Sequence, residues 1–106
     1  MNAHEFVNEW KNEKEKMLQT YQDILSESLV SSKINELNLD DNKKIILNDI
    51  LNDILNDVFY TFLLGLDGST NVGNGMQETF KIYDSSNNLV AKEGELEVEA
   101  FEQFMT

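Results

Sequence analysis

A four-residue pattern dominates the middle of the chain: Ile-Leu-Asn-Asp occurs three times in succession, starting at Ile46, Ile50 and Ile54. Two apolar residues followed by two polar ones, repeated every four positions, place the apolar pairs on one side of an α-helix. Each repeat advances the helix by about 400°, slightly more than a full turn, so the apolar stripe winds around the axis. The pattern predicts one long helix over residues 41–64.

Residues at both ends of this segment support the same helix. Asp40 or Asp41 supplies a carboxylate that can cap the first turn, and Gly65 and Gly68 supply places where the helix can end. Residues 58–66 are apolar nearly all round the helix. We therefore expect neighbouring elements to cover this end and to form the core there.

A second apolar stripe runs through the N-terminal part of the chain and predicts a helix from residue 2 to about residue 30. Its members are Phe6, Trp10, Met17, Tyr21, Ile24 and Leu25. The stripe skips a turn at Glu13 and Lys14, so either the helix passes over an edge there or its first turns project freely.

Ser31 and Ser32 interrupt this stripe, and residues 33–37 are expected to add one further helical turn. Two long helices joined by a short connection pack antiparallel, because neither can bury its apolar stripe alone. This part of the chain therefore predicts a helical hairpin over residues 2–66.

The pattern changes after the helical hairpin. Residues 67–76 form a glycine-rich loop, residues 79–83 alternate as a half-buried strand, residues 84–88 are typical of a turn, and residues 89–92 return as an antiparallel partner. An isolated β-hairpin is marginal in water, so its apolar face should lie on the helices.

The last segment fits two structures. Leu96, Val98 and Ala100 alternate as in a strand, whereas Leu96, Ala100 and Phe104 follow a helical period. Glutamates near the start of the segment suit a helix N-terminus, so we expect a helix from about Glu95.

The predicted fold class is α+β. It consists of an antiparallel pair of long helices packed with a C-terminal β-hairpin and a short C-terminal helix, the last two within residues 77–106. A chain of 106 residues has the usual length of one domain, so we expect a single small acidic domain over residues 1–106.

Composition narrows the choice of partners. The chain has 20 acidic residues and 8 basic ones, all lysine, for a net charge of −12. This balance argues against direct binding to nucleic acid or to an anionic membrane and favours a basic protein as partner. Cysteine is absent, residues 1–6 do not start a secretory signal, and the apolar run at 58–66 is too short to span a bilayer, so we expect a cytoplasmic protein.

The most distinctive candidate surface is a row of aspartates, Asp49, Asp53 and Asp57, four positions apart on one ridge of the predicted helix. Three interpretations are open: a solvated face, a negative strip that binds a basic protein, and mimicry of the phosphates of DNA. Trp10 either packs in the core or, if it is exposed beside Phe6, belongs to the partner-binding surface.

One candidate metal site follows the predicted helical hairpin. Asp67, Ser69, Asn71 and Glu78 fall at positions 1, 3, 5 and 12 of the twelve-residue spacing of a calcium loop. Val72 stands at position 6, where such a loop requires glycine, and the residues after Glu78 predict a strand rather than a helix. Calcium binding is therefore one alternative, and a glycine-rich connector without any cofactor is the other.

No pattern in the sequence indicates catalysis. His4 is the sole histidine, and it lies near the N-terminus, where a histidine is more often an exposed helix residue than a catalyst. We therefore expect no serine to have an imidazole partner, and no phosphate-binding loop is present. Carboxylates that could act as acid and base, such as Asp67, Glu78 or the glutamates at 95, 97 and 99, are not fixed in a pocket by any pattern. We expect a protein that is not an enzyme.

Three segments of the C-terminal half carry a resemblance: FYTFLLGLDG at 59–68, KIYD at 81–84 and GELE at 94–97. With them the chain resembles small acidic uncharacterised bacterial proteins, some of which are similar to immunity proteins of toxin systems. The resemblance carries over no functional residue.

These observations lead to one main hypothesis, a protein-binding module of the immunity or inhibitor type that acts on a basic partner. The alternatives are a structural homo-oligomer, such as a homodimer with residues 58–66 in its core, and a DNA mimic or phage-encoded protein that interferes with the host.

Overall fold

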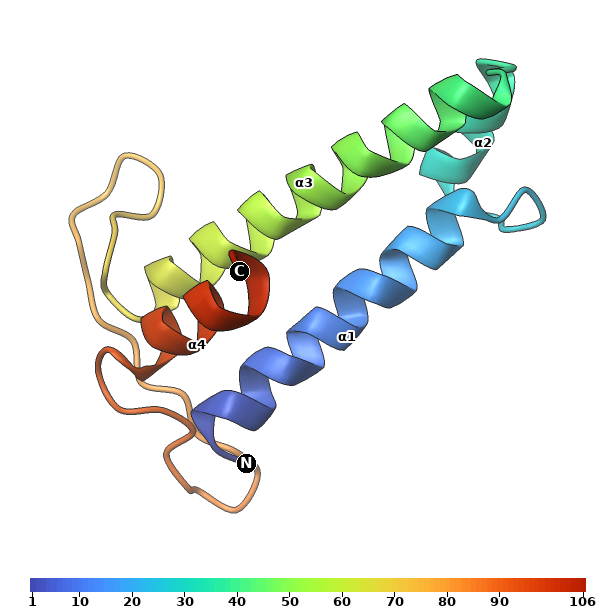
Figure 1. The fold of residues 1–106 in the computed structure, drawn as a ribbon. Helices are drawn as coiled ribbons and strands as arrows, with labels where there is room; N and C mark the ends of the chain where they lie inside the picture. The colour runs from blue at the N-terminus through green and yellow to red at the C-terminus, as the bar shows by residue number, and fades with distance from the viewer.

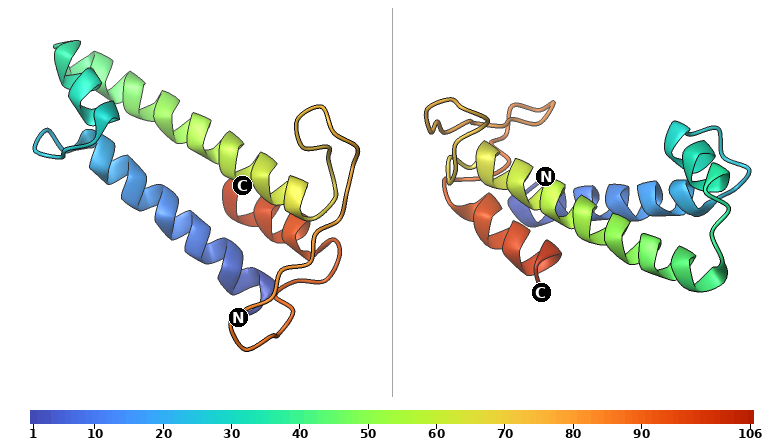
Figure 2. Two further views of the ribbon diagram at one scale, coloured as in Figure 1. Left: turned by 180° about the vertical axis from the view of Figure 1, so that it is seen from behind. Right: turned by 90° about the horizontal axis from the view of Figure 1, so that it is seen from above.

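The computed structural model describes residues 1–106 and contains four helices: α1 (Ala3–Gln22), α2 (Leu29–Glu36), α3 (Asp41–Leu66) and α4 (Glu95–Phe104). The long helices α1 and α3 run antiparallel, and the short α2 connects them at one end of the molecule (Figure 1). At the other end α4 packs against both, beside the start of α1 and the end of α3 (Figure 2). None of the four helices combines the length and apolar composition of a membrane span.

Side-chain caps explain where the long helices begin. The carboxylate of Asp40 accepts a hydrogen bond of 2.9 Å from the amide of Lys43, and the side chain of Asn2 accepts one of 2.9 Å from the amide of Glu5. Each cap satisfies an amide that has no partner within its own helix. The repeat-bearing helix thus starts where its sequence predicts.

The end of α3 depends on two glycines in different ways. Gly65 lies inside the helix, and an added Cβ would stand 2.9 Å from Cγ2 of Val72, so the absence of a side chain lets the following loop approach. Gly68 has a φ of +76°, a left-handed conformation that glycine adopts without strain. The helix therefore continues past Gly65 to Leu66 and ends just before Gly68.

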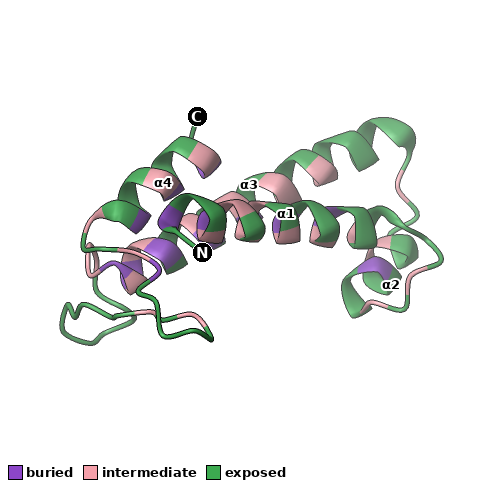
Figure 3. Cartoon of the chain, turned by 90° about the horizontal axis from the view of Figure 1, so that it is seen from below, coloured by how far each residue is buried: buried purple, intermediate pink, exposed green.

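The core lies where α1, α3 and α4 meet (Figure 3). It consists of Ala3, Val7, Leu18, Leu55, Phe59, Leu63, Leu96, Ala100 and Phe104. The rings of Phe59 and Phe104 stack with centroids 5.8 Å apart, which joins α3 to α4. The apolar end of α3 is thus partly covered, by the N-terminal helix on one side and the C-terminal helix on another.

The predicted β-hairpin is absent, so the α+β fold class is wrong and the fold is helical. Between α3 and α4 the chain forms one isolated bridge, from Tyr83 to Leu89, closed by a hydrogen bond of 2.8 Å from the amide of Val90 to the carbonyl oxygen of Ile82. The turn chemistry is present, since the amides of Asn88 and Ser86 donate to the carboxylate of Asp84 and lower its pKa.

The bridge does not extend into strands because no third strand supports it. The amide of Phe80, which a ladder would use, donates instead to the carbonyl oxygen of Leu66, at 3.3 Å. Two strands without a neighbour are marginal in water. The segment therefore packs Ile82 against the helical core as an irregular loop, in which Val90 is buried.

The first helix is shorter than its apolar stripe predicts. It ends at Gln22, and the next two apolar residues, Ile24 and Leu25, are 69% and 85% exposed in the connection to α2. The carboxylate of Asp23 accepts a hydrogen bond from the amide of Leu25, which stabilises a turn in place of helix. The short α2 then begins after Ser28, which caps it through the amide of Ser31.

Candidate protein-binding surface

An exposed apolar ridge runs along α3. We call it the outer ridge, and it consists of Ile46, Ile50, Ile54, Val58 and Phe62, spaced four residues apart. Each of these residues is between 48% and 59% exposed. The leucine that follows each isoleucine lies about 100° further round the helix and turns inward, so that Leu47 and Leu51 are half-buried and Leu55 is buried.

The second polar position of each repeat forms a row beside the outer ridge. The acidic row consists of Asp49, Asp53 and Asp57, all of them exposed and none of them in an ion pair. Each aspartate follows an isoleucine by three residues, which places it on the neighbouring ridge of the helix, about 60° away. One face of α3 therefore presents apolar and negative side chains in parallel lines.

Trp10 is joined to the end of the outer ridge. Its ring lies 6.3 Å from the ring of Phe62, the last ridge residue, and 5.9 Å from that of Phe59 in the core. Phe6, one turn earlier on α1, meets Trp10 edge to face at 6.3 Å. Trp10 is half-buried. The structure thus brings Trp10 and the outer ridge together. Trp10 packs against the core and also borders the outer ridge.

The chain leaves much of its surface uncovered. Its radius of gyration is 16.4 Å, against about 13 Å for a compact domain of this length. Its accessible surface is 7532 Å², which is roughly 1,500 Å² more than a compact monomer of this mass exposes. This excess is larger than the roughly 800 Å² that one protein contributes to a typical complex. The half-exposed side chains of the outer ridge are part of this uncovered surface.

This ridge was not predicted from the sequence, because each Ile-Leu pair was placed as a unit on one apolar face. Adjacent residues on a helix point about 100° apart, so only one member of each pair can face the narrow contact with α1. The signal was present in the fixed order of the repeat, with isoleucine always next to the aspartate row and leucine always next to asparagine.

The predicted metal residues do not converge. Both carboxylate oxygens of Asp67 accept backbone hydrogen bonds from the start of α4, from the amide of Gly94 at 2.9 Å and from that of Glu97 at 3.1 Å. Ser69 donates to the carboxylate of Glu97 at 2.9 Å, while Asn71 and Glu78 are exposed in the loop. Nowhere do three or more acidic or histidine side chains gather in a group that could hold a metal ion. In this arrangement Asp67 and Ser69 attach α4 to the end of α3.

The sole histidine also connects two helices. Nδ1 of His4 lies 2.9 Å from Oε2 of Glu99, and the side-chain amide of Gln103 donates to the same oxygen at 3.0 Å and to the carbonyl oxygen of His4 at 3.2 Å. The hydrogen bonds from His4 and then Gln103 lower the pKa of Glu99. This cluster ties the first turn of α1 to α4 on the surface of the molecule.

The comparisons with known proteins add no family: no family model, curated protein or solved structure matches the chain.

Proposed function

We propose that the protein is a non-enzymatic binding module, and that α3 holds a basic, amphipathic helix of another protein against the outer ridge and the acidic row. The observation that carries the proposal is the placement of these two lines side by side on one exposed helix. An apolar ridge supplies affinity by burial, and a parallel row of charge sets the orientation and identity of the partner.

The dimensions of the surface suit a helical partner. From Ile46 to Phe62 the outer ridge spans about 24 Å, the length of a helix of roughly 16 residues. Over that distance a partner helix can place one apolar side chain per turn on the ridge. Lysine or arginine beside its apolar face would then meet Asp49, Asp53 and Asp57.

A second copy of the chain is a less suitable occupant of the ridge. If two copies paired their α3 helices antiparallel about a two-fold axis, both acidic rows would lie on the same side of the contact, aspartate against aspartate. Each copy also carries a net charge of −12. Like charges at close range oppose such a dimer, whereas a basic helix gains from the same arrangement.

Binding of a toxin or another basic protein at this surface would make the module an immunity protein or an inhibitor. This is the form of the proposal that agrees with the resemblance of residues 59–68, 81–84 and 94–97. It predicts that the partner contributes a cationic helix rather than a nucleic acid or a membrane.

A pair of designed peptides tests the proposal. One is an amphipathic helix of about five turns with leucine on one face, lysine on both flanks and no tryptophan; the other has glutamate in place of each lysine. Trp10 is the only tryptophan of the chain and packs against the end of the ridge, so its fluorescence reports occupancy, with calorimetry as a second measurement. We expect the lysine peptide to bind, and the glutamate peptide not to bind.

Matched variants separate the acidic row from net charge alone. D49N/D53N/D57N should weaken binding of the lysine peptide about tenfold, as expected for three exposed ion pairs. E27Q/E36Q/E102Q changes the net charge equally at exposed positions away from the ridge and should leave binding within about twofold, since diffuse charge is screened by salt. Equal weakening by both variants would refute the proposed role of α3.

A further inference from the structure

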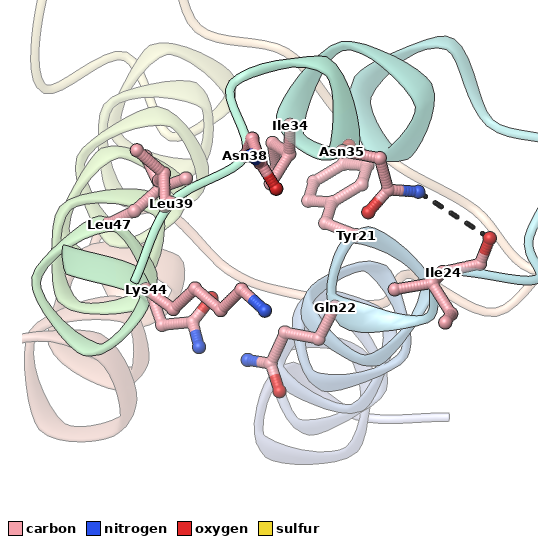
Figure 4. Close-up of a pocket in the computed structure, with 10 residues that line it drawn as sticks. Tyr21, Gln22, Ile24, Ile34, Asn35, Asn38, Leu39, Lys44 and Leu47 are labelled. Carbon is pink, nitrogen blue, oxygen red and sulfur yellow. Dashed lines mark hydrogen bonds between the residues drawn. The ribbon is translucent and has the colours of Figure 1, made fainter. Parts of the chain in front are cut away.

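A pocket of about 230 Å³ opens between α1, α2 and α3 at the end of the molecule opposite α4 (Figure 4). Its apolar wall comes from all three sides: Tyr21 at the end of α1, Ile34 on α2, and, on the third side, Leu39 just before α3 and Leu47 within α3. These side chains face the same space, and none belongs to the buried core, although Tyr21 packs against its edge. The pocket is therefore separate from the outer ridge and from the contact with α4.

The charge of this pocket differs from that of the rest of the surface. The chain has 20 acidic residues, yet none of the ten residues around the pocket is aspartate or glutamate. Four other hollows on the surface each include at least one carboxylate, from Glu93, Asp67, Glu102 or Asp57. An anion in this pocket would therefore touch no carboxylate of its lining, whereas in each of the four others it would.

Lys44 supplies a positive charge at the mouth of the pocket. Its ammonium group lies toward the side chain of Gln22 across the opening (Figure 4), and it takes part in no ion pair. The side-chain amides of Gln22, Asn38 and Asn48 also border the pocket and make no hydrogen bond within the protein. The mouth thus combines one cation with amide donors, while the wall behind it is apolar.

We infer that this pocket binds a small amphiphilic carboxylate, with its carboxylate group at Lys44 and its hydrocarbon part against Tyr21, Ile34 and Leu47. A carboxylate fits the unpaired ammonium and the amide donors. A volume of about 230 Å³ holds roughly eight groups of the size of a water molecule, which corresponds to a chain of about six to eight carbons.

Such a ligand would also join elements that touch little in the protein alone. The first half of α3 has no buried residue, and α2 contacts α1 but not α3. A molecule held between Leu47, Ile34 and Tyr21 would connect the three helices. Binding should therefore stabilise this end of the molecule against local opening.

Octanoate is the probe for the test, and its binding can be followed in ¹⁵N-labelled protein by the side-chain amide signals of Gln22, Asn38 and Asn48. We expect these signals to shift together and to saturate with a Kd of about 1 mM, in keeping with a ligand of this size. Acetate tests the head group alone, octanol the chain alone, and octylamine the opposite charge. Each of these should bind at least about tenfold more weakly.

Two neighbouring lysines provide the matched variants. K44Q should weaken octanoate binding about tenfold, the effect of losing one hydrogen bond to a charged group, and K44R should restore it. K43Q removes the same charge one residue earlier, outside the pocket, and should bind as the unchanged protein does. Circular dichroism checks that every variant is folded.

Three results would overturn the inference. One is the absence of shifts at Gln22, Asn38 and Asn48 at 20-fold the expected Kd, that is about 20 mM octanoate. Another is equal binding of octanoate and octylamine, since that would show a site indifferent to charge. The third is equal loss in K43Q and K44Q, because it would place the effect in the overall field of the protein rather than at the mouth of the pocket.

Discussion

Nζ of Lys14 donates a hydrogen bond of 3.0 Å to Oδ1 of Asn56, within the contact between α1 and α3. Lys14 is buried, and its ammonium group also lies 3.3 Å from Oε1 of Glu15 and 5.9 Å from the ring centroid of Phe104. It stands at the position where the apolar stripe of the first helix skips a turn. The helix packs through this position, with the stem of lysine in place of an apolar side chain.

This pair leads to the first prediction. N56L removes the oxygen that Lys14 uses and should lower the free energy of unfolding by about 2 kcal/mol, because a buried cation loses a hydrogen bond. K14M/N56L replaces both partners by apolar side chains and should be more stable than N56L, since no unpaired group remains. Urea denaturation of the single and double variants measures the coupling. Equal stability of N56L and the unchanged protein would show that the bond contributes nothing.

The second prediction concerns the attachment of α4. Asp67 is the residue after α3, and its carboxylate caps α4 through the amides of Gly94 and Glu97. D67A should lower the free energy of unfolding by about 1–2 kcal/mol, as the loss of an N-cap does. Hydrogen exchange should become faster first in α4.

A control for D67A is D57A, which removes an aspartate of the acidic row that makes no hydrogen bond through its side chain. Its stability should stay within about 0.5 kcal/mol of the unchanged protein, as for most surface substitutions. If both variants lose the same stability, the cap is not the cause.

The third prediction is a dependence on acid at Glu99. Hydrogen bonds from His4 and Gln103 lower the pKa of Glu99 in the folded protein below its ordinary value of 4.5. A carboxylate whose pKa is depressed by folding stabilises the protein above its unfolded pKa, and that contribution is lost as the pH falls through the folded pKa. Stability should therefore drop below about pH 4.5, and E99Q should remove part of this drop.

The matched variant for E99Q is E102Q, at an exposed glutamate on the same helix whose side chain makes no hydrogen bond. Thermal unfolding from pH 3 to pH 6 compares the two. A pH profile of E99Q that coincides with that of E102Q would argue against a role for the cluster of His4, Glu99 and Gln103.

The fourth prediction tests the orientation of the repeats. Ile54 is half-exposed on the outer ridge, whereas its neighbour Leu55 is buried in the core. L55A should lower the free energy of unfolding by about 2–4 kcal/mol because it leaves a cavity, and I54A by about 1 kcal/mol or less. Equal losses in urea denaturation would mean that α3 is rotated relative to the structure.

Local signals were sufficient to predict the long helices but not all of their ends. The period of the repeat and the cap at Asp40 define α3 to within two residues at its C-terminus. The stripe of α1 continues past its true end because Ile24 and Leu25 keep the helical spacing, while the turn depends on hydrogen bonds of Asp23. Ser31, which looked like an interruption, is buried and donates to the carbonyl oxygen of Asp23.

The β-hairpin failed for a reason that is not local. Alternation at 79–83 and turn residues at 84–88 are both present, and the turn forms. Whether a bridge grows into strands depends on a third strand or on a wide apolar face, and the sequence pattern of the two segments contains neither piece of information.

Of the candidate binding surface on α3, the sequence predicted only the exposed acidic row. Exposure of Asp49, Asp53 and Asp57 follows from their spacing and charge. Exposure of Ile50 and Ile54 depends on how α3 is rotated against α1 and α4, and the repeat alone does not determine that rotation. The pocket beside Lys44 likewise depends on the place of α2, which no periodicity determines.

Among the helices, α4 is the last to be synthesised, and it closes the core. While a ribosome is still making the loop before it, Val7 and Phe59 have no third helix against them, however well α1 and α3 have formed. His4 and Glu99, which join α1 to α4 by a hydrogen bond, are 95 residues apart in sequence. Stable folding therefore has to wait until residue 104 is available. A nascent chain that stalls earlier exposes the apolar faces of α1 and α3 to chaperones and proteases.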